Sequence, residues 1–327
     1  MSDVTLLGLL ESEPGSYVSG EEISKKLNVS RTAIWKQVRK LEAEGYVIEA
    51  TPRLGYRLKD KPARLTPQEL LPKLTTNSFG RNVRILDVVG STQDELRVLA
   101  EQGAPEGTLV IAEQQTSGRG RMGRSWVSPS GKGVWMSLLL RPSVPLPLTP
   151  QLTLLAAVAL SRAITRIVPL DIGIKWPNDL LVNGRKISGI LLESAAEDER
   201  LRYVIVGLGI SANLDPEDYP AELLEKAISL KMAAGHAISR SELIAAVLEQ
   251  FEQLYALYLE QGFAPIRALW EARSVTLHRP ATLHTPQGAI VGVPRGLDDM
   301  GGISVELEDG SMRTIYSAEV GNPAADR

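Results

Sequence analysis

The sequence predicts an α+β protein of three domains. Three observations favour this architecture: three amphipathic helices followed by two short strands, a long region of alternating strands and helices, and a final stretch of short β-rich runs between glycines. A length of 327 residues suits two or three domains. We expect the domains to span residues 1–62, 65–273 and 274–327, with a charged, proline-containing linker at residues 59–64.

The first region is typical of a winged helix-turn-helix domain. Ser19 is expected to cap the second helix, with Glu22 reaching back to complete a capping box, and Ser30 is expected to cap the third helix. Two short strands around the turn at residues 51–55 predict a wing. Apolar residues at helical spacing mark the buried face of the third helix: Ile34, Val38 and Leu41.

The other faces of the third helix are basic. No acidic residue occurs between Ile23 and Leu41. A solvated helix face would give the same pattern, but the two helices, the Ser30 cap and the wing together favour DNA binding, with the third helix in the major groove. Phosphate contacts would make that binding salt-dependent. The residues expected to contact DNA are Ser30, Arg31, Thr32, Trp35, Lys36, Arg39, Lys40 and, at the wing tip, Arg53.

The central region alternates strands and helices, and the last region contains only short strands. We expect strands at residues 83–89, 109–114, 134–141, 172–176, 186–193 and 201–207, with helices at 152–167 and 241–260. These elements predict a mixed sheet covered by helices on one side. Short runs at residues 281–283, 289–294, 303–307 and 313–317 predict a small β-barrel.

Composition excludes several kinds of site. The chain has no cysteine, so disulfides, thiolate catalysis and cysteine-based zinc sites are excluded, and its three histidines show no metal-ligand spacing. The net charge of −3 means that any nucleic-acid contact depends on a local basic patch. The start, Met1-Ser2-Asp3, is not a signal peptide, and the apolar run at residues 152–160 is too short and interrupted to span a membrane. We therefore expect a cytoplasmic location.

The most specific motif is GRGRMGR at residues 118–124, followed by Ser125-Trp126. Its glycines let the backbone approach an anion closely, and successive N–H groups can form an anion-binding nest. Its three arginines would repel one another unless an anion lay among them. The alternative is a flexible basic surface loop. The motif is not a P-loop, because no Gly-Lys-Ser/Thr follows.

Three further motifs are candidate site segments. Residues 175–179 (KWPND) join a strand to a turn, and Lys186 follows at the start of an apolar strand, where it can point a charge into a site. Residues 90–95 (GSTQDE) open a helix, and such an N-terminus both caps itself and offers N–H groups to a ligand. Residues 207–213 (GLGISAN) lie at a strand end, where the glycines either admit a ligand or only make a bend.

With these motifs in hand, the chain resembles the bifunctional biotin–protein ligases and biotin operon repressors over nearly its whole length. The resemblance implies a ligase core with an SH3-like C-terminal barrel. It implies a biotin site of Ser91, Thr92, Gln93, Gln115, Arg119, Gly120, Arg121, Lys186, Gly189, Gly207 and Gly209. It also implies a nucleotide site of Arg121, Arg124, Asn178, Lys186, Ser211 and Asn213. Gln93 and Ser211 stand where the family often has Asn, and Asn213 is a candidate to compensate for Ser211.

The family's activity is ATP-dependent formation of biotinyl-5′-AMP, then transfer of biotin to a lysine of biotin carboxyl carrier protein, with ATP and Mg²⁺ as cofactors. The resemblance makes Lys186, Arg121 and Asp179 the catalytic residues, with Asp179 either contacting Mg²⁺ or orienting the incoming lysine. Other implied partners are operator DNA and a second copy of the chain, which would form a homodimer when the adenylate is bound. Rival interpretations are a lipoate or octanoate ligase and a regulator that only senses a small molecule.

Overall fold

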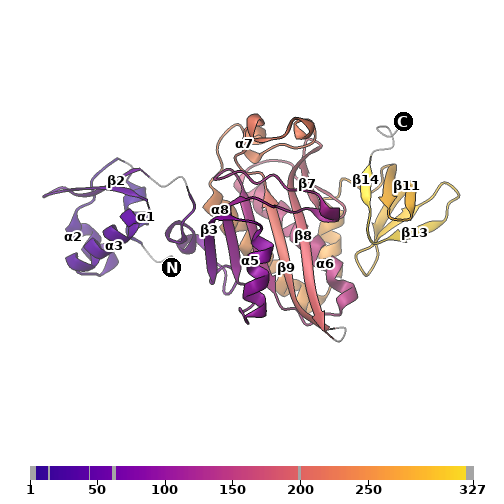
Figure 1. Ribbon diagram of the computed structural model, residues 1–327, viewed down its shortest axis with the longest axis horizontal. Helices are drawn as coiled ribbons and strands as arrows, with labels where there is room; N and C mark the ends of the chain where they lie inside the picture. Colours follow the sequence, from indigo (N-terminus) through magenta and orange to yellow (C-terminus); the bar gives the residue numbers. More distant parts are fainter. Residues whose placement is uncertain (1–4, 14, 44, 61–63, 198–199, 322–327) are drawn as a thin grey trace. The chain divides into compact units, whose positions relative to one another are not determined.

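The computed structural model describes residues 5–321 apart from residues 14, 44, 61–63 and 198–199. The chain divides into two compact units, Met1–Lys73 and Leu74–Arg327 (Figure 1). Met1-Ser2-Asp3 and the middle of the proposed linker lie outside the described residues. The division into three domains at residues 62 and 273 therefore stays a prediction.

The first unit has the predicted winged helix-turn-helix architecture. Its elements are α1 (Leu6–Ser12), α2 (Gly20–Leu27), α3 (Arg31–Ala43), β1 (Val47–Thr51), β2 (Gly55–Asp60) and the short α4 (Pro67–Leu70). The two strands pair antiparallel and form the wing. Apolar side chains of the three helices pack into one core, among them Leu10, Ile23, Ile34, Val38 and Leu41. The helix-period pattern of α3 thus predicted its buried face correctly.

The helix caps in this unit are confirmed, except for one contact. The Ser19 hydroxyl accepts the Glu22 N–H at 3.1 Å, and the Ser30 hydroxyl accepts the Ala33 N–H at 3.2 Å. The predicted second half of the capping box is wrong. The Glu22 carboxylate pairs instead with Lys26, 2.7 Å away. A lysine four residues further along the helix offers a charge-assisted contact that outcompetes a neutral N–H.

The second unit contains the predicted mixed sheet, which has seven strands where six were predicted. Strands β3 and β4 are parallel, and every other neighbouring pair is antiparallel. The order across the sheet is β3 (Val83–Val89), β4 (Leu109–Gln115), β5 (Val134–Leu140), β9 (Arg200–Ile210), β8 (Arg185–Glu197), β7 (Asp179–Val182) and β6 (Gly173–Lys175). All six predicted strands are present. The short β7 was not predicted.

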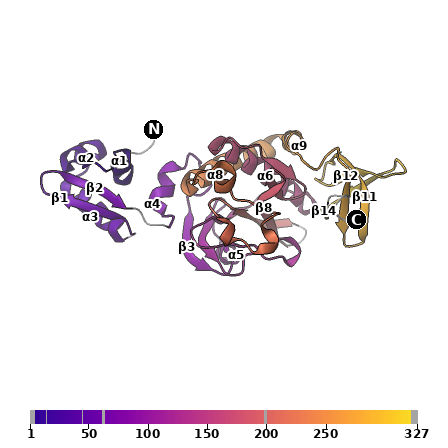
Figure 2. The ribbon, with the colours of Figure 1, turned by 90° about the horizontal axis from the view of Figure 1, so that it is seen from above.

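Helices cover both faces of this sheet, so the prediction of helices on one side is wrong (Figure 2). Helix α5 (Thr92–Glu101) packs on one face through Leu96, and α6 (Thr149–Ile167) and α8 (Arg240–Gln261) pack together on the other. The physical reason is visible in β5, where all seven residues are buried. A strand with two buried faces requires cover on both sides of the sheet.

Helix α6 is longer and more apolar than the sequence pattern suggested. The segment Leu146–Ile167 has the length and hydropathy of a membrane span, and 72% of its most apolar window is buried inside the protein. Burial of this kind is that of a core helix. The apolar run that was predicted at residues 152–160, and judged too short to span a membrane, is part of this longer segment.

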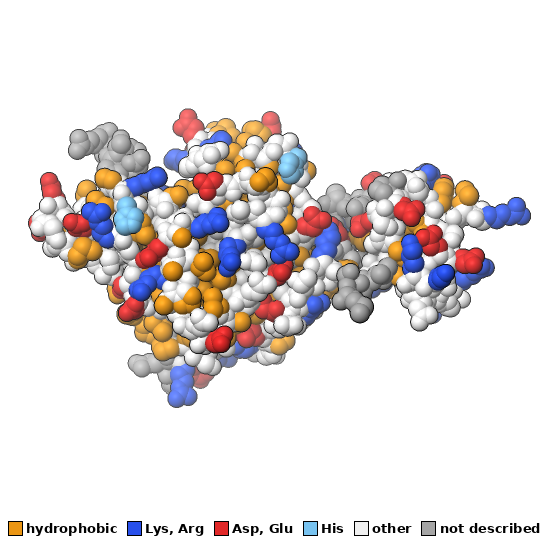
Figure 3. Space-filling view, turned by 180° about the vertical axis from the view of Figure 1, so that it is seen from behind, with side chains coloured by type: hydrophobic (Ala, Val, Ile, Leu, Met, Phe, Trp, Pro, Cys, Tyr) orange, Lys and Arg blue, Asp and Glu red, His pale blue; other side chains and the backbone are white. Residues whose placement is uncertain are grey.

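Acidic and basic side chains are interspersed over the face of the molecule drawn in Figure 3.

The C-terminal region forms a five-stranded antiparallel sheet. Its order is β13 (Met312–Ile315), β12 (Ile303–Glu306), β11 (Gly288–Leu297), β10 (Ala281–Thr285) and β14 (Glu319–Gly321). The register of β11 against β12 shifts between Pro294 and Gly296, which bends the longest strand. Four of the strands match predicted runs, and the fifth, β14, was not predicted. Between α8 and this sheet lies α9 (Ala264–Glu271).

Candidate active site

A cavity of about 700 Å³ lies where the N-terminus of α5, the GRGRMGR segment, the β6–β7 turn and strands β8 and β9 meet. It brings together motifs that are far apart in the sequence. Every residue predicted for the biotin site lines it, as do the predicted nucleotide-site residues other than Asn213. The predicted motifs thus converge on one place.

The GRGRMGR segment is a tight hairpin. Gly120 N–H donates to the Arg124 carbonyl at 2.7 Å, and Trp126 N–H donates to the Gly118 carbonyl at 2.8 Å. The turn is at Met122 and Gly123, whose φ angles of 57° and 74° give it the geometry of a type I′ turn. The exposed side chain of Met122 stands at the tip. The segment therefore has a defined hairpin conformation in the ligand-free protein.

The hairpin's arginines are already engaged by the protein. Arg119 forms a two-pronged pair with Asp94, at 2.6 and 2.9 Å, and Arg124 pairs with Glu319. The arginines lower the pKa of both carboxyls through these hydrogen bonds. The expectation that only a bound anion relieves the arginines' repulsion is thus wrong for these two, because protein carboxylates do so.

Arg121 differs from its neighbours. Its guanidinium donates to the Asn178 amide oxygen at 3.2 Å and to the Ser317 hydroxyl at 3.0 Å, both of which are neutral. Burial lowers its pKa, although Asp179 opposes that shift. A half-buried cation whose hydrogen bonds go to neutral oxygens is a favourable partner for an incoming anion, because the anion supplies a charge that these hydrogen-bond partners lack.

Lys186 lies on β8 at the edge of the cavity. Its ammonium is 2.7 Å from an Asp179 carboxylate oxygen and 5.2 Å from the centre of the Trp126 ring. Its backbone is also fixed: its N–H donates to the Lys226 carbonyl, and its own carbonyl accepts from Ile228 N–H. Lys186 is therefore a cation positioned at the cavity wall beside a carboxylate.

The β6–β7 turn orients Asn178. The predicted strand at residues 172–176 ends one residue early. Lys175 and Asp179 lie opposite each other in the antiparallel pairing of β6 with β7, on either side of a tight connection. The Asn178 side-chain amide donates to the Ile190 carbonyl at 2.9 Å. Its amide oxygen is left to accept from Arg121. Asn178 thus connects the hairpin to β8 at the cavity wall.

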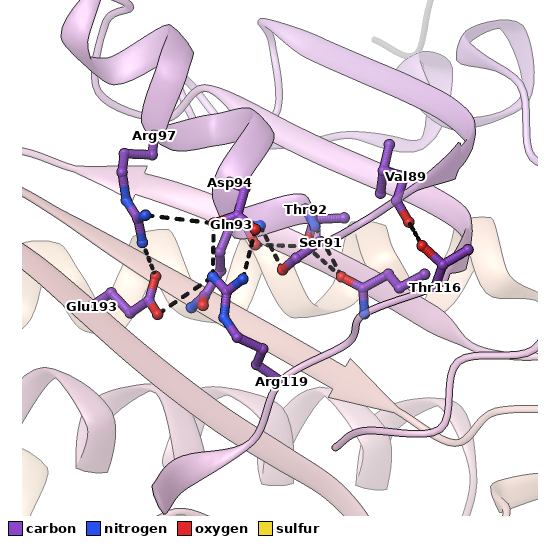
Figure 4. A network of polar contacts seen from close by, with 11 residues as sticks. Val89, Ser91, Thr92, Gln93, Asp94, Arg97, Thr116, Arg119 and Glu193 are labelled. Carbon is purple, nitrogen blue, oxygen red and sulfur yellow. Dashed lines mark hydrogen bonds and ion pairs between the residues drawn. The ribbon is translucent and has the colours of Figure 1, made fainter. Parts of the chain in front are cut away.

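Polar side chains at the start of α5 also line the cavity, and Figure 4 shows them beside Arg119. Ser91 caps the helix by accepting Gln93 N–H. Gln115 accepts the Thr92 N–H at 2.9 Å and donates to the Ser128 hydroxyl at 3.0 Å. The Gln93 side chain is 3% exposed and donates to the Leu191 carbonyl at 2.6 Å, while its amide oxygen is buried without a partner among the described residues.

GLGISAN lies at the end of β9, as predicted, and its two glycines are among the last four residues of the strand, which ends at Ile210. An added Cβ at Gly209 would lie 2.6 Å from the Trp126 indole, and one at Gly207 would lie 2.6 Å from the Gln93 amide nitrogen. The close approach at these glycines is made by side chains of the protein, so the prediction that they admit a ligand stays a prediction. The glycines make room for two side chains that themselves line the cavity.

Asn213 is not brought to the cavity. Its side chain forms two hydrogen bonds with the backbone of Ile238, at 2.8 and 2.9 Å. Both functional groups of its amide are used in holding a loop, so it cannot compensate for Ser211 in this arrangement. Ser211 itself lines the cavity.

Sequence reasoning missed two segments of the cavity wall. Residues 214–228 contribute Tyr219, Leu223 and Ala227, and the C-terminal sheet contributes Glu319 and its neighbours. Both are short irregular or edge segments, without the period-two or period-3.6 pattern that predicts elements. The first segment is held by Asp215, whose carboxylate lies 2.9 Å from Lys132 and 2.7 Å from Lys231. No local sequence pattern indicates these contacts.

The sequence matches known protein families in three separate ranges. Residues 86–211 match the biotin/lipoate A/B protein ligase family, residues 5–57 an HTH domain, and residues 276–320 the biotin protein ligase C-terminal domain. The chain is 45% identical to the bifunctional ligase/repressor BirA of Bacillus subtilis, over 96% of this chain and 97% of that protein. The chain belongs to the biotin protein ligase family.

Other members of this family are similar to the chain over different shares of its length. Bifunctional ligase/repressor BirA of Escherichia coli is 28% identical over 98% of this chain and 97% of its own length. The solved biotin protein ligase from Aquifex aeolicus, in complex with biotin and ATP, superposes with a TM-score of 0.64 at 31% identity and covers 74% of this chain and 98% of its own. This biotin protein ligase therefore carries an N-terminal HTH domain in addition to the ligase regions.

The HTH domain of this biotin protein ligase exposes the predicted DNA-binding face. The predicted residues Ser30, Arg31, Thr32, Lys36, Arg39 and Lys40 are all exposed, and Trp35 is 52% exposed. Arg39 lies over the Trp35 ring and pairs with Glu42 at 3.0 Å. Arg53 occupies the wing tip with a φ of 67°. The face is thus available to a polyanion, with part of Arg39's charge already offset.

Proposed function

We propose that the protein forms biotinyl-5′-AMP from biotin and ATP, transfers biotin to a lysine of biotin carboxyl carrier protein, and represses transcription in response to biotin. One observation carries the ligase part: the half-buried Arg121 and the positioned Lys186 line the same cavity as the polar end of α5. Two anionic reactants need such cations where they meet.

In the first step a biotin carboxylate oxygen attacks the α-phosphorus of ATP. A C(O)O–P bond forms, the bond to pyrophosphate breaks, and pyrophosphate leaves. Lys186 would hold the carboxylate and the α-phosphate, exchanging its Asp179 partner for the substrates. Arg121 would neutralise the charge that develops on the phosphorus oxygens.

In the second step the neutral amine of the acceptor lysine attacks the acyl carbon: a C–N bond forms, the C–O bond to AMP breaks, AMP leaves, and the nitrogen gives up one proton to yield the amide. The anhydride already stores the driving force, so the protein positions the reactants and excludes water. Asp179, released by Lys186, would either orient the incoming amine or contact Mg²⁺. The cysteine-free chain has no thiol for a covalent acyl-enzyme.

Mg²⁺ fits the site as a companion of ATP. No group of three His, Asp or Glu side chains suited to a metal ion occurs within the described part of the chain. Mg²⁺ commonly uses one or two carboxylates together with substrate phosphates. Asp179 supports that mode, and the bound ion would supply charge neutralisation for the pyrophosphate.

We propose that the two substrates divide the cavity, with biotin at the end lined by the start of α5. We assign biotin to Ser91, Thr92, Gln93, Gln115, Arg119, Gly120, Arg121, Lys186, Gly189, Gly207 and Gly209. We assign the nucleotide to Arg121, Arg124, Asn178, Lys186 and Ser211. The buried, unpartnered Gln93 oxygen favours biotin over lipoate or octanoate, because a ureido ring offers N–H donors that a dithiolane ring or an alkyl chain lacks.

The repressor part rests on the exposed basic face of α3 and on the full-length similarity to ligase/repressors. Operator DNA would receive α3 in the major groove and Arg53 at its backbone or minor groove. We further propose that the adenylate-bound protein forms a homodimer that matches a two-fold operator, and that it acts in the cytoplasm.

The decisive experiment incubates the purified protein with a carrier domain, ATP, Mg²⁺ and labelled biotin, lipoate or octanoate in parallel. Biotin-dependent labelling of the carrier, with neither other acid incorporated, is the expected result. Labelling by lipoate or octanoate instead would identify a different acyl ligase. No labelling by any of the three acids would favour the rival interpretation, a regulator that only senses a small molecule.

A further inference from the structure

Four charged side chains form an alternating network beside the biotin end of the cavity (Figure 4). Arg119 is paired with Asp94 at 2.6 Å and with Glu193 at 3.5 Å. Arg97 is paired with Glu193 at 2.6 Å and with Asp94 at 3.5 Å. Each carboxylate therefore contacts both arginines. Of these contacts, the one between Arg119 and Asp94 is two-pronged.

This network joins three separate elements. Asp94 and Arg97 belong to the first turns of α5, Glu193 to β8, and Arg119 to the GRGRMGR hairpin. Figure 4 shows the Arg119 side chain reaching back from the hairpin toward the helix. The network thus connects the start of the hairpin to the helix that carries the predicted biotin ligands.

The hairpin has few other connections on this side. Thr116 and Ser117 donate their N–H groups to the Val89 and Gly90 carbonyls, both at 2.9 Å. Beyond Ser117, the hairpin's backbone bonds run between its own two arms. Among the three arginines, Arg121 and Arg124 reach toward the C-terminal sheet, and Arg119 alone reaches α5.

The Arg119 guanidinium is therefore committed to a protein carboxylate. Its pairing with Asp94 raises the pKa of Arg119 and lowers that of Asp94, so both stay charged at neutral pH. A two-pronged arginine–carboxylate pair fixes orientation as well as distance. The charge of Arg119 thus acts as an anchor between the hairpin and α5.

We propose that Asp94 is a positioning residue: it anchors the base of the GRGRMGR hairpin to α5 through Arg119 and so keeps the biotin end of the cavity in its binding shape. The proposal rests on the proposed ligase function for its kinetic consequence. Its structural consequence, a hairpin that opens more often without Asp94, is independent of that function.

The test compares Asp94→Asn with Glu95→Gln. Both substitutions remove one acidic charge from the first turn of α5, so they weaken the interaction with the helix dipole equally. Only Asp94 contacts Arg119. Hydrogen exchange is measured in the ligand-free protein at the Gly120 and Trp126 amides, and steady-state kinetics are measured with biotin and with ATP.

For Asp94→Asn we expect exchange at both amides to accelerate about three- to tenfold, as for loss of a partly exposed charge-assisted pair. We expect a similar rise in KM for biotin, with kcat and the KM for ATP within about twofold of wild type. Asp94→Glu should recover part of the protection, because it keeps the charge. Glu95→Gln should match wild type in both measurements.

Unchanged exchange in Asp94→Asn would overturn the anchor, as would an equal acceleration in Glu95→Gln, which would point to the helix end. A fall in kcat with KM for biotin unchanged would also overturn it, since positioning of the binding site predicts the opposite. A wild-type protein without biotin-dependent activity would refute the proposed function, while the exchange comparison would still decide the anchor.

Discussion

Replacing Lys186 with methionine tests the central electrostatic argument. Methionine keeps most of the length and apolar stem of lysine and removes only the ammonium. The ammonium lies 2.7 Å from Asp179 and over the Trp126 ring. The substitution therefore deletes the cation proposed to bring the biotin carboxylate and the α-phosphate together.

The expected loss is large for the reaction and small for the fold. A cation about 4 Å from a developing negative charge is worth about 4 kcal/mol at an effective dielectric of about 20. This magnitude corresponds to a fall in adenylation rate of roughly 10²–10³, as for removal of one preorganised donor. The side chains of Lys186 and Asp179 are 32% and 22% exposed, so solvent screening keeps the lost ion pair to about 1 kcal/mol of folding stability.

The assay is biotin-dependent exchange of labelled pyrophosphate into ATP, with thermal unfolding measured in parallel. The matched control is Arg185→Met, which removes a positive charge one residue earlier on β8, at a side chain outside the cavity wall. We expect the control to stay within about twofold of wild type. An exchange rate in Lys186→Met within threefold of wild type would refute the assignment of Lys186 to the reacting anions.

Three other substitutions test separate parts of the proposal. Arg121→Gly should leave the fold intact and speed release of the adenylate about tenfold or more, since a desolvated cation is lost; unchanged dissociation in a rapid-dilution assay would exclude that role. Gly209→Ala should weaken biotin binding by about 1–3 kcal/mol in calorimetry, because its Cβ would lie 2.6 Å from the Trp126 indole; wild-type affinity would mean that the indole moves freely. Lys36→Ala should lower operator affinity and reduce the salt slope by about one; an unchanged slope would remove Lys36 from the phosphate contacts.

The elements that the sequence predicted well are those with strong local patterns. The apolar spacing of α3 and the alternation of strands with helices in the core depend on neighbours along the chain, and the structure agrees with both. The exceptions follow from contacts that the pattern does not contain. Glu22 forms an ion pair with Lys26 and does not complete the capping box. The four-residue strand β7 is too short for a period to be recognised.

The membership of the candidate site was also predictable, but its internal chemistry was not. GRGRMGR, KWPND and Lys186 could each be recognised in the sequence because each is distinctive by itself. Residues of all three line one cavity. Which arginine is available to an anion could not be read from the motif. That distinction depends on Asp94, 25 residues away from Arg119, and on Glu319, 195 residues away from Arg124.

The same reasoning separates three arginines that look equivalent in the sequence. Two of them meet carboxylates and so stabilise the hairpin: Arg119 fixes its base to α5, and Arg124 joins it to β14. The third, Arg121, is the most desolvated and meets only neutral oxygens through its hydrogen bonds. Because a half-buried cation whose hydrogen bonds go only to neutral oxygens gains most from a new anion, binding energy from the substrates should be concentrated at Arg121. The cost of removing the other two arginines should then appear mainly in the order of the hairpin.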